Sequence, residues 1–505
     1  MKKIIYGLIT LLLSGCSDFL KEYSQTQTVA KEVSHFDEVL LGDGYIPASA
    51  CEYISTNYAG WLNTLDDDIT TVPNGTAGKK WAGMMQPLFG YYAWQLEVGR
   101  NPEGNTLRDD SQTWLEFYRR INVVNIILKE IDDISVDSPA EEKDRIRVKG
   151  ECHFIRGQLF FTLINLYAKA YNEATSTTDP GVPLKLTEYV EHDNDKDIQF
   201  ERTPVAQVYN QIVKDLQSAV TFLTESPQSR PLHRASRQAA LLLLSRVYLY
   251  MQDWENARQT AEELLTEQAT LSQINTQASA FLTEENPEVL FSQGSLNVQN
   301  SIQGEQGDFA VSPELVELFD TTDYRRNFFV PHFTTGALGL SAKYKTGIEF
   351  VSHISDIFTL RIAEAYLNMA EACAMLDATE EANRYLQRLR ENRIENYRHT
   401  AYSGEQLIDE IRLERRRELC FEGHRWFDLR RYAVCKTYPY SKPIRHQFNV
   451  YESRNYHWER TDTYVLKEND PAYTFQIPQS VLEYDKVPMP ANPREKRQPV
   501  GEDDE

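Results

Sequence analysis

The chain has 505 residues and a formal net charge of −22, which disfavours binding to nucleic acid or to anionic lipid surfaces. Hydrophobic residues make up 41% of it and aromatic residues 11%, enough for a large buried core with aromatic side chains to spare. Cysteines other than Cys16 show no CxxC spacing, which argues against a disulfide framework and a zinc site. This composition suits a neutral ligand or a protein partner.

The N-terminus has the organisation of an export signal. Two lysines precede an apolar stretch of roughly ten residues, and a bilayer core needs about 20, so the stretch is too short to span a membrane. The following Leu-Ser-Gly-Cys is similar to the bacterial lipobox, in which the cysteine is acylated, for example with palmitate. We predict a signal peptide over 1–15, a lipid on Cys16 and a polar tether over 16–35. An ordinary secretory signal with a chance cysteine is the alternative.

Helical patterns dominate the chain from residue 114 to residue 432. Apolar residues recur there at spacings of three and four, which is typical of amphipathic helices. The predicted helices cover 114–132, 143–171, 203–223, 236–251, 254–267, 356–376, 378–393 and 403–432. Two consecutive pairs, beginning at residues 236 and 356, carry small residues where their helices would cross, as in tetratricopeptide hairpins. The predicted fold is therefore mainly α, with tetratricopeptide-like helical hairpin repeats.

Three regions do not follow a helical period and are rich in Gly, Asn, Asp, Pro and aromatic residues. They cover about 53–113, 292–350 and 433–490. Long irregular segments in a regular protein are usually functional or disordered, and these are too aromatic for disorder. We predict that they pack on one side of the repeats and that the first two face a ligand. A single domain is expected over 36–505, with an irregular segment over 433–490 and a polar tail over 491–505.

Several segments, taken in chain order, resemble one protein family. They include KGECHFIRGQLFFTLINLYAKAY (149–171), VYNQIVKDLQSAVTFL (208–223), TLRIAEAYLNMAEA (359–372), ERRRELCFEGHRWFDLRR (414–431) and YTFQIPQSVLEYDKVPMP (473–490). Together with CSDFLKE at the mature start, they are similar to motifs of the SusD/RagB family of outer-membrane nutrient-binding lipoproteins. Gly157 and Gln158 depart from the usual small residues of the first motif, and 292–350 aligns with no ligand-binding motif.

The resemblance implies an α-helical lipoprotein at the bacterial cell surface. Such proteins cover a TonB-dependent, SusC-like β-barrel transporter and capture oligosaccharides, or sometimes peptides, for import, without catalysis and without a cofactor. A tetratricopeptide-like envelope scaffold that binds only proteins is the rival interpretation. A pure scaffold would not need a long aromatic loop before its repeats, which favours the capture protein.

The aromatic loop over 61–98 provides the candidate ligand-binding residues. Sugar rings have an apolar face and a polar edge, so flat aromatic side chains beside short polar ones suit them. Exposed aromatics are costly without a ligand or partner. The predicted stacking residues are Trp81, Tyr92 and Trp94, with Asn74 and Asp67 as polar partners, whereas Trp61 and Phe89 are expected to pin the loop to the helices.

Other polar motifs are predicted to be structural. The arginines of 414–431 interleave with acidic residues at helical spacing, which indicates ion pairs, with Arg425 expected to pair with Glu422 or Asp428. Glu151 and Glu371 lie within helix motifs, so a glycosidase pair is disfavoured. No metal site is predicted: Asp66–Asp68 lacks the flanking oxygen donors of a calcium loop and is expected to form a solvated turn. The scattered histidines His153, His353 and His424 lack a second ligand at helical spacing.

Overall fold

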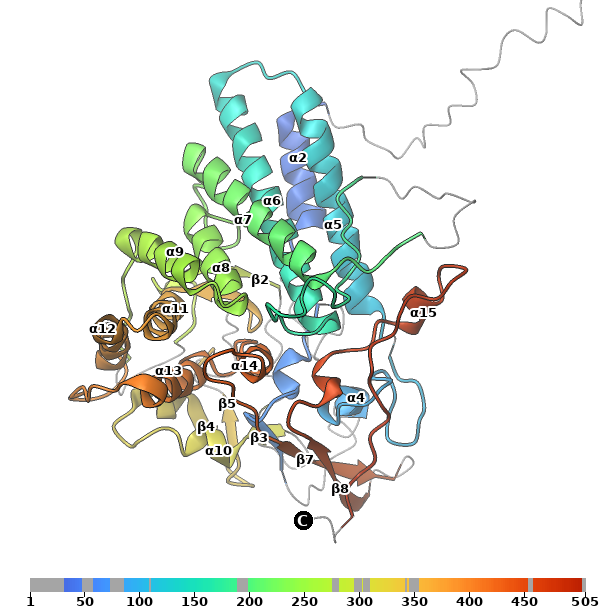
Figure 1. The fold of residues 1–505 in the computed structure, drawn as a ribbon, viewed down its shortest axis with the longest axis vertical. Coiled ribbons are helices and arrows are strands. Elements are labelled where there is room, and N and C mark those ends of the chain that lie inside the picture. The colour runs from blue at the N-terminus through green and yellow to red at the C-terminus, as the bar shows by residue number, and fades with distance from the viewer. Residues whose placement is uncertain are drawn as a thin grey trace, which may run out of the picture.

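A computed structural model provides the fold of the chain (Figure 1). It describes residues 31–47, 58–72, 86–108, 110–188, 199–274, 281–294, 302, 309–340, 343–344, 354–452 and 457–501. Cys16, Asn74 and Trp81 lie outside these ranges. Helices form the upper and left-hand parts of the molecule in Figure 1, whereas most of the labelled strands lie at its lower end and β2 lies beside α8. Among the described residues no helix combines the length and apolar character that crossing a membrane would require.

The longer helices lie close to their predicted positions. They are α2 (Val33–Val39), α5 (Gln112–Glu130), α6 (Pro139–Tyr167), α7 (Val205–Glu225), α8 (Arg237–Tyr250), α9 (Trp254–Glu267), α11 (Ile362–Met375), α12 (Thr379–Glu391), α13 (Gly404–Leu419) and α14 (Arg425–Ala433). Consecutive helices pack against each other from α5 to α9, and α11 then packs on α9, α12 and α13 (Figure 1). The predicted helical class with tetratricopeptide-like hairpins is confirmed.

The start of several helices follows local capping chemistry. The Ser138 hydroxyl accepts a hydrogen bond from the Glu141 N–H at 3.2 Å, with Pro139 at the first helical position of α6. Ser236 and Asp253 cap α8 and α9 in the same way, each accepting from the N–H three residues later. These caps satisfy backbone donors that the first helical turn leaves without acceptors.

Gly150 and Gly157 allow α6 to approach α7 closely. A Cβ atom at Gly157 would lie 3.1 Å from the Leu216 side chain, and one at Gly150 would lie 2.8 Å from Leu223. The departure from the family motif at Gly157 therefore has a packing reason, because a larger side chain would displace a buried leucine of α7.

Two predicted helix boundaries are wrong. The segment predicted as one helix over 356–376 begins with a strand, β6 (Phe358–Arg361), and α11 starts only at Ile362. The helix predicted over 403–432 is broken between α13 and α14, where Phe421 (φ 58°) and Gly423 (φ 74°) adopt left-handed backbone conformations that end a helix.

The described strands form four two-stranded antiparallel sheets, namely β1 (Ile69–Thr71) with β3 (Phe309–Val311), β2 (Val289–Gln293) with β6, β4 (Phe329–Pro331) with β5 (Leu338–Leu340), and β7 (Ile444–Tyr451) with β8 (Trp458–Leu466). The hairpin β7–β8 runs from the Ile444–Leu466 pair to the Tyr451–Trp458 pair. It shows that 433–490, expected to be irregular, contains the longest sheet of the described chain. Short helical turns occupy Leu40–Gly44, Leu62–Thr64, Gln86–Leu88, α4 (Phe89–Tyr92), Ile131–Asp133, α10 (Pro313–Val316), Tyr324–Phe328, Pro471–Tyr473 and α15 (Gln479–Leu482).

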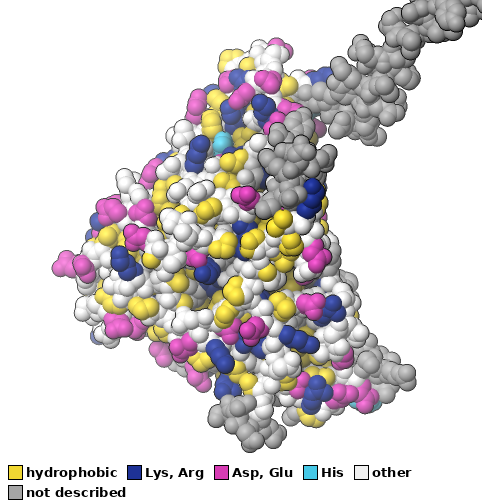
Figure 2. Space-filling model, turned by 45° about the vertical axis from the view of Figure 1, so that its right-hand side comes forward, with side chains coloured by type: hydrophobic (Ala, Val, Ile, Leu, Met, Phe, Trp, Pro, Cys, Tyr) yellow, Lys and Arg dark blue, Asp and Glu magenta, His cyan; other side chains and the backbone are white. Residues whose placement is uncertain are grey.

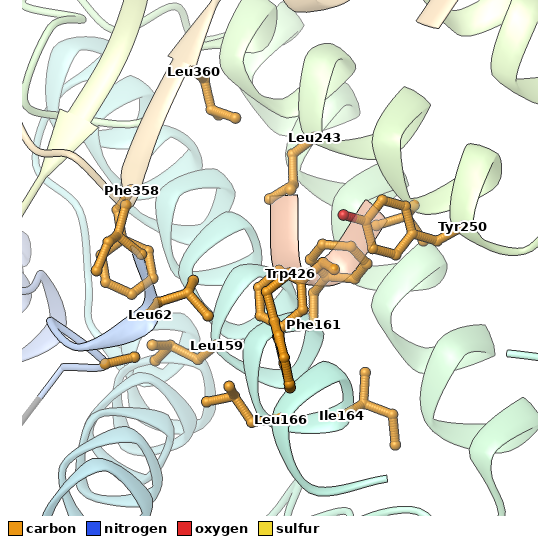
Figure 3. Packing of buried hydrophobic residues seen from close by; sticks show 14 of the residues in the cluster. Leu62, Leu159, Phe161, Ile164, Leu166, Leu243, Tyr250, Phe358, Leu360 and Trp426 are labelled. Carbon is orange, nitrogen blue, oxygen red and sulfur yellow. The ribbon is translucent and has the colours of Figure 1, made fainter. Parts of the chain in front are cut away.

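The hydrophobic core joins the helices to the irregular segments. One cluster of buried apolar side chains extends from Val33 to Met489. Figure 3 shows Trp426 of α14 among side chains of α6, α8 and β6, including Phe161 and Leu243. Four cysteines are buried and unpaired within this core, as expected for small apolar side chains: Cys152, Cys373, Cys420 and Cys435.

Candidate functional site

The aromatic residues predicted to stack on a ligand are core residues where the structure describes them. Tyr92 and Trp94 have no exposed surface. Both rings stack on the imidazole of His446 in β7, with centroid distances of 4.0 Å for Tyr92 and 4.4 Å for Trp94. The Trp94 indole N–H donates to the Leu65 carbonyl at 2.9 Å. A ligand cannot reach either ring, so the assignment of these two residues to a ligand platform is wrong.

Asp67 is likewise committed to the interior. Its carboxylate accepts from Arg425 Nε at 2.7 Å and Nη2 at 2.8 Å, and Lys442 Nζ lies 2.8 Å away. Burial alone would raise its pKa, but the positive charges of Arg425 and Arg416 hold the pKa of Asp67 well below its usual range. The predicted role as a polar ligand contact is therefore wrong for Asp67, and the prediction for Trp81 and Asn74 concerns residues outside the described ranges.

The neighbouring acidic residues form a buried cluster instead of the predicted solvated turn. Carboxylate oxygens of Asp66, Asp67 and Asp68 lie within 4.8 Å of one another, in a spacing that a metal ion could bridge. Burial raises the pKa of both Asp66 and Asp68. Because three cations already surround the cluster, its negative charge is compensated by the chain itself; they are Arg416, Arg425 and Lys442. The expectation of no metal here stays a prediction.

Trp61 and Phe89 are core residues, but their ring contacts are to Tyr91, Phe475 and the hairpin β7–β8, whereas the prediction placed them against the helices. Trp61 is buried and stacks on Tyr91 at a centroid distance of 4.3 Å, and the Phe475 ring lies 4.8 Å from it in a tilted arrangement. Phe89 contacts Phe448 of β7 edge-on at 5.0 Å. The aromatic loop thus forms the interface between the helices and the hairpin β7–β8.

The charged stretch 414–431 is a buried ion-pair network, which confirms its structural interpretation, although the expected partners of Arg425 are wrong. Glu418 receives Arg325 Nη1 at 2.7 Å, Arg361 Nη1 at 2.6 Å and Arg393 Nη2 at 3.0 Å. Arg361 Nε also contacts Glu422 at 2.7 Å. All these side chains are buried. The network joins α13 to the segment just after α12 through Arg393, to β6 through Arg361 and to the turn Tyr324–Phe328 through Arg325.

The carboxylates considered as a catalytic pair are occupied by structural contacts. Glu151 accepts from the Tyr45 hydroxyl at 2.5 Å and forms ion pairs with Arg147 and Arg234. Glu371 forms a double ion pair with Arg431 at 2.6 and 2.8 Å. Both are fully buried, so neither faces a substrate. His153 contacts Asp215 at 2.9 Å, His424 is buried, and His353 lies outside the described residues.

An aromatic side chain that does face solvent occurs in the hairpin β4–β5, inside the second irregular region. Phe333 is 94% exposed at the tip of this hairpin. The side chain therefore presents an apolar ring face to solvent that a ligand or partner could cover. Next to it lie the exposed Val330 and Pro331 and the hydroxyl-bearing Thr334 and Thr335.

The hairpin holds this tip in a defined conformation. At its base, Phe329 pairs with Leu340 and packs edge-on against Phe319 at 5.3 Å. The His332 N–H donates to the Ala337 carbonyl at 2.9 Å, and the Gly336 N–H donates to the His332 carbonyl at 2.9 Å. Gly336 adopts a φ of 70°, which a glycine tolerates without strain. A preformed tip loses little conformational entropy when it binds.

The exposed tip lies on a chain of connected sheets that leads to the second hairpin. β5 contacts β3, β3 pairs with β1, and β1 packs against β7 (Figure 1). Trp458, the first residue of β8, is 44% exposed, and its indole N–H donates to the Thr461 hydroxyl at 3.3 Å. The hairpins β4–β5 and β7–β8, which carry these two exposed aromatic side chains, both lie at the lower end of the molecule in Figure 1. Sequence reasoning named the region 292–350 but missed Phe333, whose signal was an aromatic residue inside a Thr-Thr-Gly turn.

Comparison with known families places this fold. Residues 80–249 match a family model described as starch-binding associating with outer membrane, and residues 340–488 match the model of the SusD family. The chain belongs to the SusD/RagB family. The first match covers α4 to α8 and the second covers β6 to α15, which includes the C-terminal hairpin, whereas α9 lies between the two.

Curated SusD/RagB relatives are distant from this chain. SusD-like protein P25 of Formosa agariphila is 26% identical over 227 residues, which span 44% of this chain but only 38% of the relative. SusD-like protein P2 of the same organism is 25% identical over 397 residues, 66% of this chain and 75% of the relative.

Solved structures share the SusD/RagB architecture almost from end to end. A putative sugar binding protein from Bacteroides vulgatus has a TM-score of 0.68 at 22% identity, covering 92% of this chain and 99% of that chain. A SusD superfamily protein from Bacteroides thetaiotaomicron has a TM-score of 0.67 at 21% identity, covering 92% and 100%. A laminarin-binding SusD-like protein has a TM-score of 0.60 at 18% identity, with the same coverage. At these identities the likeness concerns the fold.

Proposed function

We propose that this SusD/RagB protein captures an oligosaccharide at the outer membrane, with Phe333 as a stacking residue. The observation that carries the proposal is the 94% exposure of the Phe333 side chain on a hydrogen-bonded hairpin tip. An aromatic ring covers the apolar face of a sugar, and the neighbouring Thr334 and Thr335 offer hydroxyl groups to its polar edge. A laminarin-binding protein of the same fold supports a glycan as the ligand class.

The proposal extends to anchoring and to delivery. The lipid on Cys16 would hold the chain at the outer membrane, facing the exterior, and a SusC-like TonB-dependent transporter would receive the ligand. In Figure 1 the exposed hairpins lie at the end opposite the top of α2, where the described chain begins. A tether at the N-terminus therefore leaves the hairpin end accessible to glycans. The chain would act as a binding protein without catalysis.

Calorimetric titration with laminarin and soluble starch fragments tests the stacking role. Loss of a large buried side chain from a contact costs about 1.5–3 kcal/mol, so Phe333→Ala should weaken binding by roughly ten- to hundredfold. The thermal unfolding of the variant should match that of the wild type, because the exposed ring contributes little to the core.

Tyr484→Ala provides a matched control, since Tyr484 is 55% exposed. It follows α15, which lies at the right of the molecule in Figure 1, away from the hairpin β4–β5 at the lower left. This variant should retain wild-type affinity. Equal affinity of Phe333→Ala and wild type for every bound glycan would overturn the assignment of the hairpin. Binding of peptides or of envelope proteins alone, with no glycan bound, would favour the scaffold interpretation.

A further inference from the structure

The C-terminal segment, expected to be a polar tail, is packed against the molecule and closes a cavity. The Val500 N–H donates to the Thr463 carbonyl of β8 at 2.8 Å, and the Asn492 side chain donates to the Phe475 and Tyr167 carbonyls at 2.6 and 2.8 Å. Between this segment and the end of β8 lies a cavity of about 610 Å³. Ligand pockets commonly have volumes of about 300–1,000 Å³. The cavity is therefore large enough for a group of monosaccharide size.

Arg494 lines this cavity and has no ion-pair partner among the described residues. Its side chain is 5% exposed, and none of its three guanidinium nitrogens has a hydrogen-bond acceptor among the described residues. The guanidinium lies over the Phe475 ring at 4.4 Å, which compensates only part of its lost hydration. Two fully buried arginines of the ion-pair network are paired instead: Arg361 has three carboxylate partners and Arg393 has two. Arg494 differs from both, because it has no acceptor among the described residues.

The other charged side chains of the lining are positive on balance, with Arg497, Lys467 and Lys496 against Asp470 and Glu495. Arg497 donates to the Val465 carbonyl and to Asp470, but its buried Nε has no acceptor among the described residues. Lys467 and Lys496 are exposed at the wall, and neither has an ion-pair partner in the described part of the chain. Asp470 is committed to Arg497 at 2.8 Å. A positive cavity in a chain of net charge −22 indicates a specific anion.

Burial and the proximity of Arg497 lower the pKa of Arg494 to about 9. Arg494 consequently remains protonated at neutral pH. The lowered pKa also means that burial destabilises the charged form of Arg494 when no anion is bound.

We propose that this cavity binds an oxyanion through Arg494 and the Nε group of Arg497, with Lys467 and Lys496 at the rim. A guanidinium presents its N–H groups in a planar fork that matches a carboxylate or a sulfate. The anion is either the acidic group of a saccharide, such as a uronic acid, or a free inorganic ion. The net charge of the whole chain favours a neutral ligand. The excess of positive side chains around this cavity is local and cannot be inferred from the net charge.

Thermal unfolding and calorimetry of the purified protein with sodium glucuronate, sulfate and phosphate, at constant ionic strength, test the proposal, with glucose as the neutral probe. We expect a saturable rise in Tm with glucuronate and none with glucose. Arg494→Met should weaken anion binding by about ten- to hundredfold, the range expected for lost charged hydrogen bonds. Without anion, Arg494→Met should have a Tm equal to or above that of the wild type, because an unpaired buried charge is removed.

Arg460→Met is the matched control, because Arg460 lies on the same hairpin but is exposed and paired with Asp462. It should bind anions like the wild type, and so should Phe333→Ala, which separates this site from the glycan contact. Saturable binding of glucuronate supports an acidic saccharide; binding of sulfate or phosphate alone supports the same site with an inorganic anion. If Arg494→Met does not fold, Lys467→Ala and Lys496→Ala, both at exposed positions, should each reduce anion affinity.

Two results would overturn the proposal. The first is a wild-type Tm that no anion raises more than glucose does. Equally, the proposal fails if the anion-dependent rise in Tm is undiminished in Arg494→Met or, should that variant not fold, in both lysine variants. The second concerns the acidic residues that follow Gly501 in the sequence, Glu502, Asp503, Asp504 and Glu505. If anions bind only after these four are replaced by their amides, the chain supplies its own anion and no external ligand is needed.

Discussion

The replacement Glu418→Gln tests whether the buried ion pairs hold the helical repeats together. Glu418 contacts three arginines from three different elements, Arg325, Arg361 and Arg393, at 2.6 to 3.0 Å. Burial alone would raise its pKa, but the charges of Arg393, Arg361 and Arg325 keep the pKa of Glu418 well below its usual range. The carboxylate is therefore ionised at neutral pH, and glutamine removes its charge with almost no change in shape.

The expected loss of stability is large because the three arginines remain buried. Among the described residues the connected network contains six cations and six anions, which are Arg325, Arg361, Arg390, Arg393, Arg417 and Lys343 with Asp323, Glu288, Glu410, Glu414, Glu418 and Glu422. Glu418→Gln leaves one positive charge without compensation, and one face of the amide presents N–H groups to guanidinium donors. Breaking a buried pair from one side costs about 3–5 kcal/mol. We expect a loss in this range.

Urea denaturation followed by circular dichroism measures the effect, with Glu317→Gln as the control. Glu317 is exposed and has no ion-pair partner among the described residues, so its replacement should change the free energy of unfolding by less than about 0.5 kcal/mol. A loss below about 1 kcal/mol for Glu418→Gln would refute the reasoning. It would mean that water or a rearranged arginine replaces the carboxylate at little cost.

Three further outcomes follow from the same contacts. Trp94→Ala should destabilise the fold by about 3–5 kcal/mol in urea denaturation, since it removes a buried ring from the stack with His446; normal stability would contradict the burial. The free energy of unfolding should fall as the pH drops from about 6.5 towards 2, because the unfolded chain takes up protons first wherever the folded pKa is depressed. Burial lowers the pKa of His446 to about 4, and the charges of Arg325 and Arg390 outweigh burial to lower the pKa of Glu414 to about 2. The pKa values of Glu418 and Asp428 are also lowered. The raised pKa values of Asp66 and Asp68 act in the opposite direction. Unchanged urea midpoints between pH 7 and 4 would contradict this balance. Cys16→Ala should release the protein from the membrane fraction of cells, and a variant that remains there and is processed normally would refute the lipid anchor.

The helices were predictable from sequence because their signal is local. A spacing of three and four apolar residues, as in α7, reports one buried face of one helix and needs no knowledge of the rest of the chain. The break between α13 and α14 was not predictable in this way, since the apolar and charged pattern continues through Phe421 and Gly423. It depends on a tertiary contact, in which the Gly423 N–H donates to Asn63 at 2.9 Å.

The candidate site was less predictable, because exposure is a property of the whole fold. Tyr92, Trp94 and Phe333 are all aromatic residues among Gly, Thr and Ala. Two of them are covered by β7, which follows roughly 350 residues later, and the third is covered by nothing described. Composition identified loops that are rich in aromatic residues, but the pairing of loop and hairpin decides which rings face solvent.

Buried charge and exposed aromatic surface are connected in this protein. Ion pairs tie segments without regular structure to α13 and α14. Asp67 pairs with Arg425 of α14, and Asp68 pairs with Arg416 of α13. Arg325 pairs with both Asp323 and Glu418, and so links the turn before β4 to α13. Such contacts are directional and intolerant of displacement, because a buried charge that loses its partner is strongly destabilised. They fix the segments that precede β1 and β4, and hence the base of each sheet at the hairpin end. Apolar packing alone would permit small sliding of these segments. A rigid base allows Phe333 to remain exposed at a defined position, so that the free energy of stacking on a ligand is not offset by ordering the loop.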